Sequence, residues 1–211
     1  MVPKTTEPYA DTQAAYFIEG GGAVYALVGL LVKNVGEDGQ TQHHLLVGED
    51  TVHPVDERLV PLFEWFTTPR YENQVAEWLN WADAPSGFLE IIIGNGLLVS
   101  IDTANPQRAA KSLRGIRLVP LSLPDLDSPT GEGFVAIKRS EDSRADTSTS
   151  VELGEVLWGD HPRIDVPSAV SYIAGLAKMN FATAARRTLT DVPMLLEYGF
   201  IRLEWVNGRA A

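Results

Sequence analysis

The chain contains no cysteine, which excludes disulfides, thiolate metal sites, iron–sulfur clusters and cysteine nucleophiles. It also lacks a basic N-terminal signal, because Glu7 and Asp11 accompany the single Lys4 in this stretch. The most apolar run covers residues 23–32, which is far shorter than the roughly 20 residues that span a bilayer. These absences predict a cytoplasmic protein that does not cross or bind a membrane.

Basic residues are scarce, and the shortage lies in the first half of the chain. The 211 residues carry a formal net charge of −11. Residues 1–104 hold four basic and fifteen acidic residues, whereas residues 105–211 hold thirteen of each. The first half would repel DNA, and its acidic surface suits either a basic protein partner or solubility. The asymmetry suggests that the halves do different jobs.

Motifs for catalysis, metal binding and cofactor binding are also missing. The sequence has no Gly-x-Ser-x-Gly elbow, and the run Gly20-Gly21-Gly22 is not followed by the helix of a phosphate loop. His43 and His44 are adjacent on an expected strand and therefore point to opposite faces. His53 follows two acids at a spacing that matches no metal cage. We expect no catalytic residue, metal or cofactor; a hydrolytic enzyme would need a pocket of converging acids or histidines.

The most informative feature that is present is a passage that occurs twice, at residues 88–99 and 191–202. In each copy a bulky apolar triplet precedes a glycine by the same distance, Ile91–Ile93 before Gly96 and Met194–Leu196 before Gly199. Glycine adopts the left-handed helix cap without steric cost. Each copy therefore predicts the end of an amphipathic helix followed by a strand.

The rest of the first half fits one plan. A buried strand at Val24–Val32, a turn at Glu37-Asp38-Gly39 and a returning strand at 42–47 predict a β-hairpin over residues 23–48. The spacing of apolar residues predicts helices from His53-Pro54 to Phe66, over 72–81 and from 84 to 94. A strand over 97–101 ends the half.

The second half repeats this plan after a short helix at residues 105–112. Strands are expected at 116–123 and 134–138, and a polar, mobile segment at 141–150. Helices are expected around 153–157, over 165–177 and from 182 to 196, where Pro193 should kink or split the last one. A strand at 200–205 completes the unit.

These patterns predict an α+β fold with a flexible terminus (1–14) and two tandem units (15–104 and 105–211). Each unit would be a β-hairpin plus a three-helix winged-helix domain. Through the passages at Gly96 and Gly199, the units resemble winged-helix domains in general. By its order of elements, the first half is also similar to the small peptide-recognising winged-helix modules of bacterial peptide-modification systems. That resemblance implies a peptide bound as an added strand beside the hairpin.

The last long helix provides a candidate binding face, since four polar side chains fall opposite its apolar stripe: Thr183, Arg186, Arg187 and Thr190. Lys178 before the helix and Arg202 on the following strand extend the set. Arginines on such a helix reach phosphates or guanine edges in DNA complexes. Every amphipathic helix has a polar face, however, and the second half lacks the basic excess typical of nucleic-acid binders.

Two tryptophans of the first half, Trp65 and Trp81, fall off the main apolar stripes. If both were exposed together, they would mark a protein interface. The leading hypothesis is a non-enzymatic regulatory or adaptor protein that binds a protein partner. The alternative is a transcription regulator that binds DNA through its second half.

Overall fold

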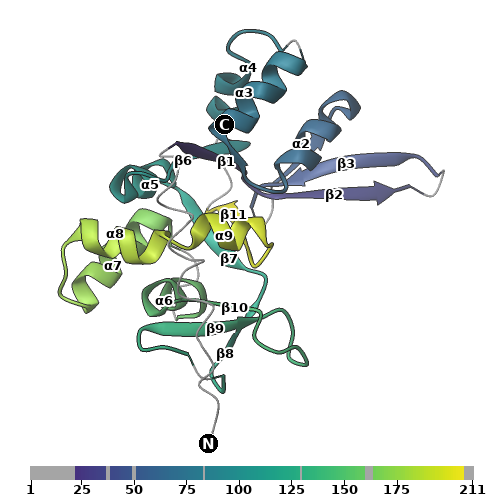
Figure 1. The fold of residues 1–211 in the computed structure, drawn as a ribbon. Helices are drawn as coiled ribbons and strands as arrows, with labels where there is room; N and C mark the ends of the chain where they lie inside the picture. Colours follow the sequence, from purple (N-terminus) through teal and green to yellow (C-terminus); the bar gives the residue numbers. More distant parts are fainter. Residues whose placement is uncertain are drawn as a thin grey trace, which may run out of the picture.

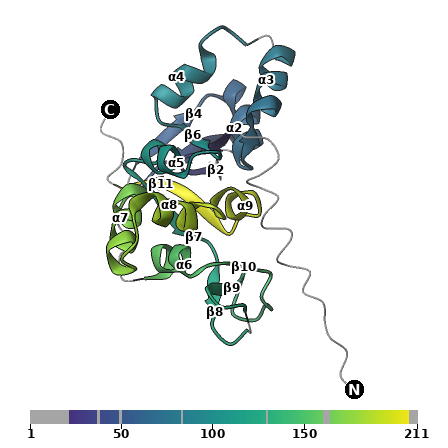
Figure 2. The ribbon, with the colours of Figure 1, turned by 60° about the vertical axis from the view of Figure 1, so that its left-hand side comes forward.

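The computed structural model describes residues 22–36, 39–48, 51–82, 84–128, 130–159 and 164–206, and shows a mixed α+β fold. The helices α2 to α4 lie at one end of the molecule and the strands β8 to β10 at the other (Figures 1 and 2). The last strand, β11, lies between these two regions. No described helix is both long and apolar enough to cross a membrane.

In the described part of the first half there are six strands, a 3₁₀ turn and three α-helices. In chain order they are β1 (Ala23–Leu27), β2 (Leu30–Val35), β3 (Thr41–Leu46), β4 (Val52–Val55), η1 (Glu57–Leu59), α2 (Val60–Phe66), β5 (Arg70–Tyr71), α3 (Glu72–Trp81), α4 (Phe88–Gly94) and β6 (Leu98–Asp102). The strands form two antiparallel sheets of order β5-β1-β6 and β2-β3-β4. The pair β2 and β3 projects from the body of the molecule (Figure 1).

The second half begins with α5 (Pro106–Ser112), which joins the halves. The remaining elements are β7 (Ile116–Pro120), β8 (Leu123–Asp125), β9 (Phe134–Lys138), β10 (Thr147–Ser150), α6 (Val151–Trp158), α7 (Val166–Leu176), α8 (Phe181–Leu189), α9 (Val192–Glu197) and β11 (Ile201–Trp205). The sheets are the pair β7-β11 and the three-stranded β10-β9-β8, all antiparallel. Pro193 at the start of α9 separates it from α8, as the sequence predicts.

Each half contains a two-stranded antiparallel ribbon, and the two ribbons have the same register. β1 pairs with β6, and β7 pairs with β11, over five residue pairs each. One residue beyond each ladder, the Val28 N–H donates to Leu97 O (2.9 Å) and the Leu121 N–H donates to Phe200 O (2.8 Å). A three-stranded meander follows the first strand of each ribbon, and helices precede the last strand. The described elements therefore occur twice in nearly the same order.

The two helix-to-strand passages also have the same hydrogen bonds. Gly96 and Gly199 both have φ of 68°. The N–H of the residue after each glycine bonds back to the helix, Leu97 to Ile92 O (3.2 Å) and Phe200 to Leu195 O (2.8 Å). This pattern is the Schellman motif, in which a left-handed residue closes the helix. The predicted sequence of helix, glycine and strand is confirmed in both places.

The ribbon β1-β6 lies between the two parts of the core. On one face, Ala26, Val99 and Ile101 pack with the helices of the second half in the larger apolar cluster. On the other face, Leu27 and Leu98 pack with the helices of the first half. Trp205 on β11 contacts both clusters, and its indole N–H donates to the carbonyl of Gly96 (2.9 Å). The halves are therefore packed together and not merely tethered.

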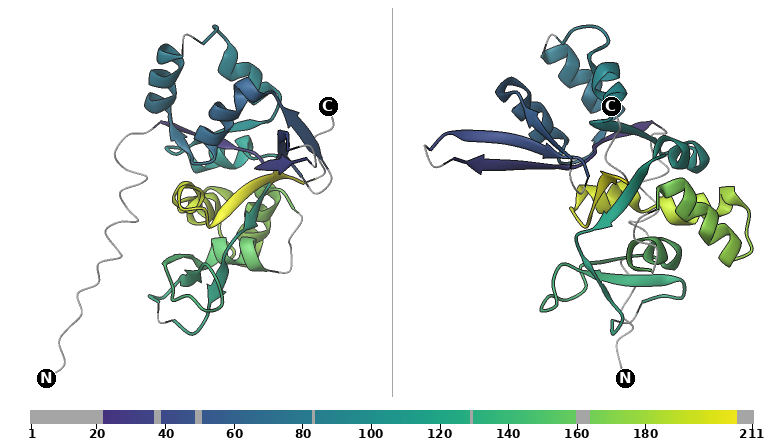
Figure 3. Two further views of the ribbon diagram at one scale, coloured as in Figure 1. Left: turned by 90° about the vertical axis from the view of Figure 1, so that its right-hand side faces the viewer. Right: turned by 180° about the vertical axis from the view of Figure 1, so that it is seen from behind.

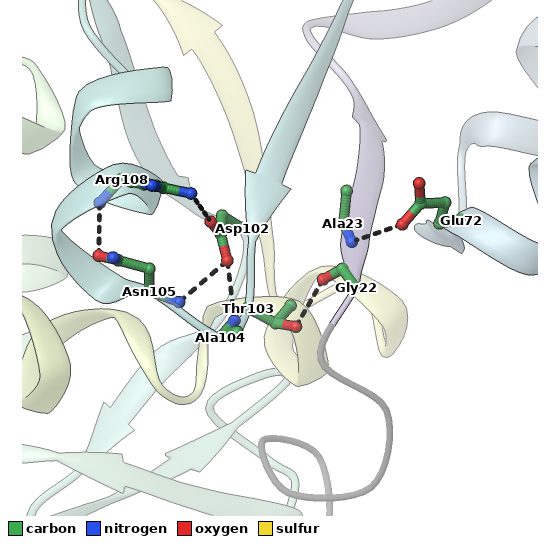
Figure 4. Close-up of polar contacts among 8 residues, drawn as sticks. All are labelled: Gly22, Ala23, Glu72, Asp102, Thr103, Ala104, Asn105 and Arg108. Atoms are coloured by element: carbon green, nitrogen blue, oxygen red, sulfur yellow. Dashed lines mark hydrogen bonds and ion pairs between the residues drawn. The ribbon is translucent and has the colours of Figure 1, made fainter.

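The chain crosses between the halves through a hydrogen-bonded turn (Figure 4). The Asp102 carboxylate accepts from the backbone N–H groups of Ala104 (3.0 Å) and Asn105 (2.9 Å). The Asn105 side chain then accepts from the Arg108 N–H (3.1 Å), so that it caps α5 at the residue before Pro106. An asparagine cap followed by proline is a favourable helix start.

Two strand predictions for the first half are wrong in detail. The apolar run 24–32 forms two strands in different sheets, because Gly29 turns the chain with φ of 112°. The segment from His53 to Val55 is not a helix start but part of β4, which pairs with β3. Ladder hydrogen bonds outweigh the proline signal there, and helical structure begins at η1 after Asp56, whose carboxylate accepts from the Arg58 N–H (2.9 Å).

In the second half, the segment 141–150 is not uniformly irregular, because residues 147–150 pair with β9 as β10. The run 116–123 is likewise divided between β7 and β8. Other predictions concern the terminus 1–14, the start of a strand at Tyr16–Ile18, His161, and the turn residues Glu37 and Asp38. These lie outside the described residues.

Candidate functional site

Among the described residues, β2 is paired along one edge alone, the edge that faces β3. At the hairpin end, the Gly36 N–H donates to Gln40 O (2.8 Å), and the β2–β3 register runs on without interruption. Hydrogen-bonded and non-bonded pairs alternate in an antiparallel ladder. The N–H and C=O groups of Leu31, Lys33 and Val35 therefore point away from β3, and no described residue bonds to them. Three donors and three acceptors therefore line the outer edge of β2, and Figure 3 shows that the hairpin projects from the body.

The opposite edge of the same sheet is blocked. The Val47 N–H donates to Thr51 O (3.0 Å), so the same alternation places the backbone N of Val52 and Pro54 on the outer side of β4. Proline has no N–H to donate, and proline on an edge strand prevents further pairing. In the second half, the corresponding first strand of the meander, β8, contains Pro124. Of the four edge strands of the two meanders, β2 and β10 lack proline, and β10 is tied to Asp191 through the Thr149 hydroxyl and the Ser150 N–H.

The outer face of the β2-β3-β4 sheet is largely apolar. Leu30 and Val52 are 39% and 53% exposed, although both belong to a sheet whose other face packs on the core through Leu45. Exposed apolar side chains on an open strand are a hazard for aggregation unless a partner covers them. Three cross-strand rows make up this face: Leu30, Leu46 and Val52; Val32, His44 and Pro54; and, near the hairpin turn, the polar pair Asn34 and Gln42.

The strands of this sheet lack the acidic residues that are frequent in the rest of the first half. The strands β2, β3 and β4 contain one lysine and three histidines and no acidic residue. Lys33 is exposed, and it makes no ion pair within the part of the chain that the structure describes. In the strand register, Lys33 lies directly opposite His43. A ligand strand at β2 would therefore lie beside one positive charge, that of Lys33, which no described carboxylate neutralises.

The basic helix face that the sequence predicts is present but partly neutralised. Arg186 and Arg187 are exposed on α8, and Thr183 and Thr190 are half-buried beside them. The Arg187 guanidinium pairs with the carboxylate of Glu152 on α6 (2.8 Å). The Thr190 hydroxyl donates to the Arg186 carbonyl (2.5 Å) and is thereby used within the helix.

The two flanking basic residues are placed differently from each other. Lys178 is exposed in the turn after α7, where it adopts a left-handed φ of 51°. Arg202 is half-buried on β11 and pairs with Glu204 (2.5 Å). Of the four basic side chains, only Lys178 and Arg186 lack an ion pair among the described residues. Contacts between α8 and its neighbours α5, α6 and α7 leave a narrow exposed stripe.

The two tryptophans do not form one exposed surface. Trp65 is half-buried, stacks on Trp78 with ring centroids 5.6 Å apart, and lies under the Arg70 guanidinium at 4.9 Å. Trp81, by contrast, is 84% exposed at the end of α3. Trp65 therefore belongs to the core of the first half, and Trp81 is an isolated exposed ring.

A buried carboxylate in the second half links β10 to the turn between α8 and α9. The Asp191 carboxylate accepts from the Thr149 hydroxyl (2.8 Å) and the Ser150 N–H (3.1 Å). Burial raises the pKa of Asp191, and these two hydrogen bonds oppose the shift only in part. The Ser150 hydroxyl donates to Arg187 O (2.7 Å). These contacts fasten the second meander to the helices, and the geometry indicates a structural role.

A second buried carboxylate lies on the ribbon β7-β11. Glu204 faces Arg117 across the ladder at 2.8 Å and also pairs with Arg202. Burial alone would raise the pKa of Glu204, but hydrogen bonds from Arg117 and Arg202 bring it below its ordinary value. Two cations around one carboxylate stabilise its charged form. The sequence alone does not reveal this group of three charged residues, because Arg117 is distant in the chain from Arg202 and Glu204.

A hydrolytic enzyme would need a pocket in which acids or histidines converge. None of the described residues form a group of three or more His, Cys, Asp or Glu side chains that could hold a metal ion. A small pocket between β7, α6 and α7 is lined by apolar side chains with Tyr172 and a single carboxylate, Glu155. A lone carboxylate without a second acid, base or nucleophile does not make the converging set that hydrolysis requires.

Comparisons with protein-family models, with curated proteins and with solved structures found no match.

The sequence carries a weak signal for the β2 edge that the hairpin prediction did not use. Val24–Val32 contains Gly29, and an isolated glycine in a strand pattern indicates a bulge or break. Pro54 in an extended segment indicates an edge strand with one side blocked. Together they indicate a break between β1 and β2 and an edge position for β4.

Proposed function

We propose that the protein is a cytoplasmic, non-enzymatic adaptor that binds an extended segment of a protein partner as an added strand at the β2 edge. Its two halves would be winged-helix units, of which the first holds the peptide and the second supports it. The observation that carries this proposal is the row of unbonded backbone groups at Leu31, Lys33 and Val35. Main-chain hydrogen bonds supply affinity in such complexes, and side chains supply specificity.

Support for the added strand comes from the contrast between the edges. β4 and β8 carry proline, whereas β2 keeps its outward donors. A protein that had no use for the β2 edge would gain from blocking it in the same way. The hairpin also projects from the body (Figure 3), so that a partner chain can reach its edge.

DNA binding through the second half has weaker support. Carboxylates neutralise Arg187 and Arg202, and nucleic-acid affinity comes mainly from unpaired basic side chains at phosphates. The matching test is a salt titration with a random DNA duplex. DNA binding would be favoured if the chain bound the duplex at low ionic strength, lost this binding as salt rose, and lost it also in Arg186→Ala.

The proposal is tested with seven-residue peptides selected by phage display on the full chain, followed by fluorescence anisotropy of a synthetic copy. Val35→Pro removes one outward N–H without removing a β2–β3 bond, and Val52→Pro makes the same change on the blocked edge. A hydrogen bond contributes about 1 kcal/mol, so Val35→Pro is expected to weaken binding by roughly tenfold once the ring also displaces the strand. Val52→Pro is expected to leave affinity within about twofold, since it breaks no bond at the β2 edge.

A second arm examines the backbone of the peptide. N-methyl groups at alternate peptide nitrogens block either the set that faces β2 or the set that faces solvent. Strand addition requires that one methylated set binds and the other does not. Equal binding of both sets, or equal loss of affinity in Val35→Pro and Val52→Pro, would refute a peptide site at this edge.

A further inference from the structure

The side-chain preference of the β2 edge follows from its register. We propose that the segment bound there carries a single carboxylate next to Lys33, with apolar residues two positions to either side. This inference rests on the proposed function, because it specifies the partner of the same edge. Its ligand class is an extended peptide of the pattern apolar, any, acidic, any, apolar.

The first step is the alternation of side chains along β2. Leu31, Lys33 and Val35 lie on one face of the sheet, because successive residues of a strand point to opposite faces. These are also the residues whose backbone groups point to the free edge. The residue of the added strand that lies directly opposite Lys33 therefore places its own side chain beside that of Lys33. Its neighbours two positions away lie beside Leu31 and Val35.

The second step is the charge around Lys33. Its cross-strand neighbour is His43, and the next residue in the same row is Val55. The strands β2 to β4 contain no acid, and the first described acid after them, Asp56, is held by Arg58 at 2.8 Å. The ammonium of Lys33 thus has no described carboxylate partner. Opposite charges directly across a ladder stabilise pairing, and like charges destabilise it.

The local charge at Lys33 and the net charge of the first half act on a bound peptide in opposite directions. The first half as a whole holds fifteen acids and four bases, which would repel a peptide rich in acidic residues. One carboxylate beside Lys33 gains the local contact at little long-range cost. Salt screens the long-range repulsion over about 8–10 Å, so that a peptide with several acids should bind better as salt rises.

The apolar positions follow from exposure. Val35 is 65% exposed and Leu31 is half-buried against the first core. An aliphatic side chain beside each of them would remove apolar surface from water on both partners. Because acid and apolar positions are symmetric about the centre, the pattern is the same for a parallel and an antiparallel added strand.

The test uses three synthetic peptides of seven residues, with valine two positions to either side of the centre and threonine elsewhere. The central residue is glutamate, glutamine or lysine. Binding to the full chain is measured by fluorescence anisotropy, and Val35→Pro establishes that binding occurs at β2. The glutamate peptide is expected to bind about fivefold more tightly than the glutamine peptide, and the lysine peptide is expected to bind most weakly.

Charge reversal gives the decisive comparison. Lys33→Glu is expected to invert the order, so that the lysine peptide binds best. Lys111→Glu is the matched control, because it changes the net charge of the protein equally at an exposed residue of α5 and should keep the wild-type order. A double-mutant cycle between Lys33 and the central residue then gives the coupling directly.

Three results would overturn the proposal in distinguishable ways. Equal binding of all three peptides, still lost in Val35→Pro, would remove the carboxylate preference and leave the peptide site intact. An unchanged peptide order in Lys33→Glu, together with self-association of Lys33→Gln in sedimentation, would show that Lys33 only protects the edge from pairing with itself. No binding of any peptide would overturn both this inference and the proposed function.

Discussion

Replacing Gly29 by alanine should destabilise the protein more than the same replacement at Gly39 or Gly175. Gly29 has φ of 112°, and its N–H donates to Leu203 O (2.7 Å). A Cβ at this position would lie 2.3 Å from Leu46 O and 3.0 Å from Val47 Cα, both of which are backbone atoms. Backbone strain at such a φ costs about 1–3 kcal/mol, and the clash forces a shift that weakens the bond to Leu203 by about 1 kcal/mol.

The expected loss is therefore about 3 kcal/mol in the free energy of unfolding. For a protein of this size, it corresponds to a fall in Tm of roughly 6–12 °C. Urea denaturation followed by tryptophan fluorescence and a calorimetric scan measure both quantities. The variant should also weaken peptide binding, because Gly29 sets the position of β2 relative to β11.

Two control substitutions separate strain from clash. Gly39 shares the positive φ (76°), but no atom lies within 4 Å of a Cβ added there. Gly39→Ala should therefore lower the free energy of unfolding by about 1 kcal/mol. Gly175→Ala within α7 also has open space and should gain up to about 1 kcal/mol, because alanine favours helix. A Gly29→Ala variant within about 0.5 kcal/mol of Gly39→Ala, close to the error of such comparisons, would refute the reasoning from the clash.

Three further substitutions test the second half. Glu204→Ala leaves the buried guanidinium of Arg117 without its carboxylate and should cost about 3–5 kcal/mol by urea denaturation; a loss under about 1 kcal/mol would contradict a buried ion pair. Asp191→Asn keeps an oxygen for the Thr149 hydroxyl but removes a buried charge. Because burial raises the pKa of Asp191, wild-type stability falls as pH rises through that pKa, whereas the variant lacks this fall. The stability of Asp191→Asn relative to wild type should therefore increase from about pH 4 upward, and a constant difference would oppose this assignment. Lys178→Gly removes a left-handed lysine from the end of α7 and should raise stability by about 0.5–1 kcal/mol, whereas a loss would indicate that the side chain makes a stabilising contact.

Local sequence signals predicted the elements that local physics controls. The helix over 72–81 is found as α3 with those bounds, because its apolar residues share a face and Pro69 ends the preceding segment. The splitting of the last helix at Pro193 follows from the missing N–H of proline. Both glycine-ended helices follow from the low cost of a left-handed glycine. In each case the interactions join residues that are close in the chain.

Long-range pairing was not predictable in the same way. β4 was interpreted as a helix start because the sequence has proline followed by two acids, and only the ladder to β3 overrides this signal. The edge donors of β2 depend on which strand pairs with which, and a single chain contains no direct record of that. The partners of Arg187 and Arg202 likewise come from contacts with Glu152 and Glu204 that the helical pattern does not encode.

The shared register of the two ribbons shows how the halves differ at equivalent positions. Val99 and Ile101 of β6 face the second half and lie in the larger core. The corresponding positions of β11 are Arg202 and Glu204, so that the same face is charged in the second half. Glu204 and Arg117 are both buried on this face, so each of these two charges depends on the other for compensation. The first strands of the two meanders differ as well, because β8 contains Pro124 whereas β2 contains no proline.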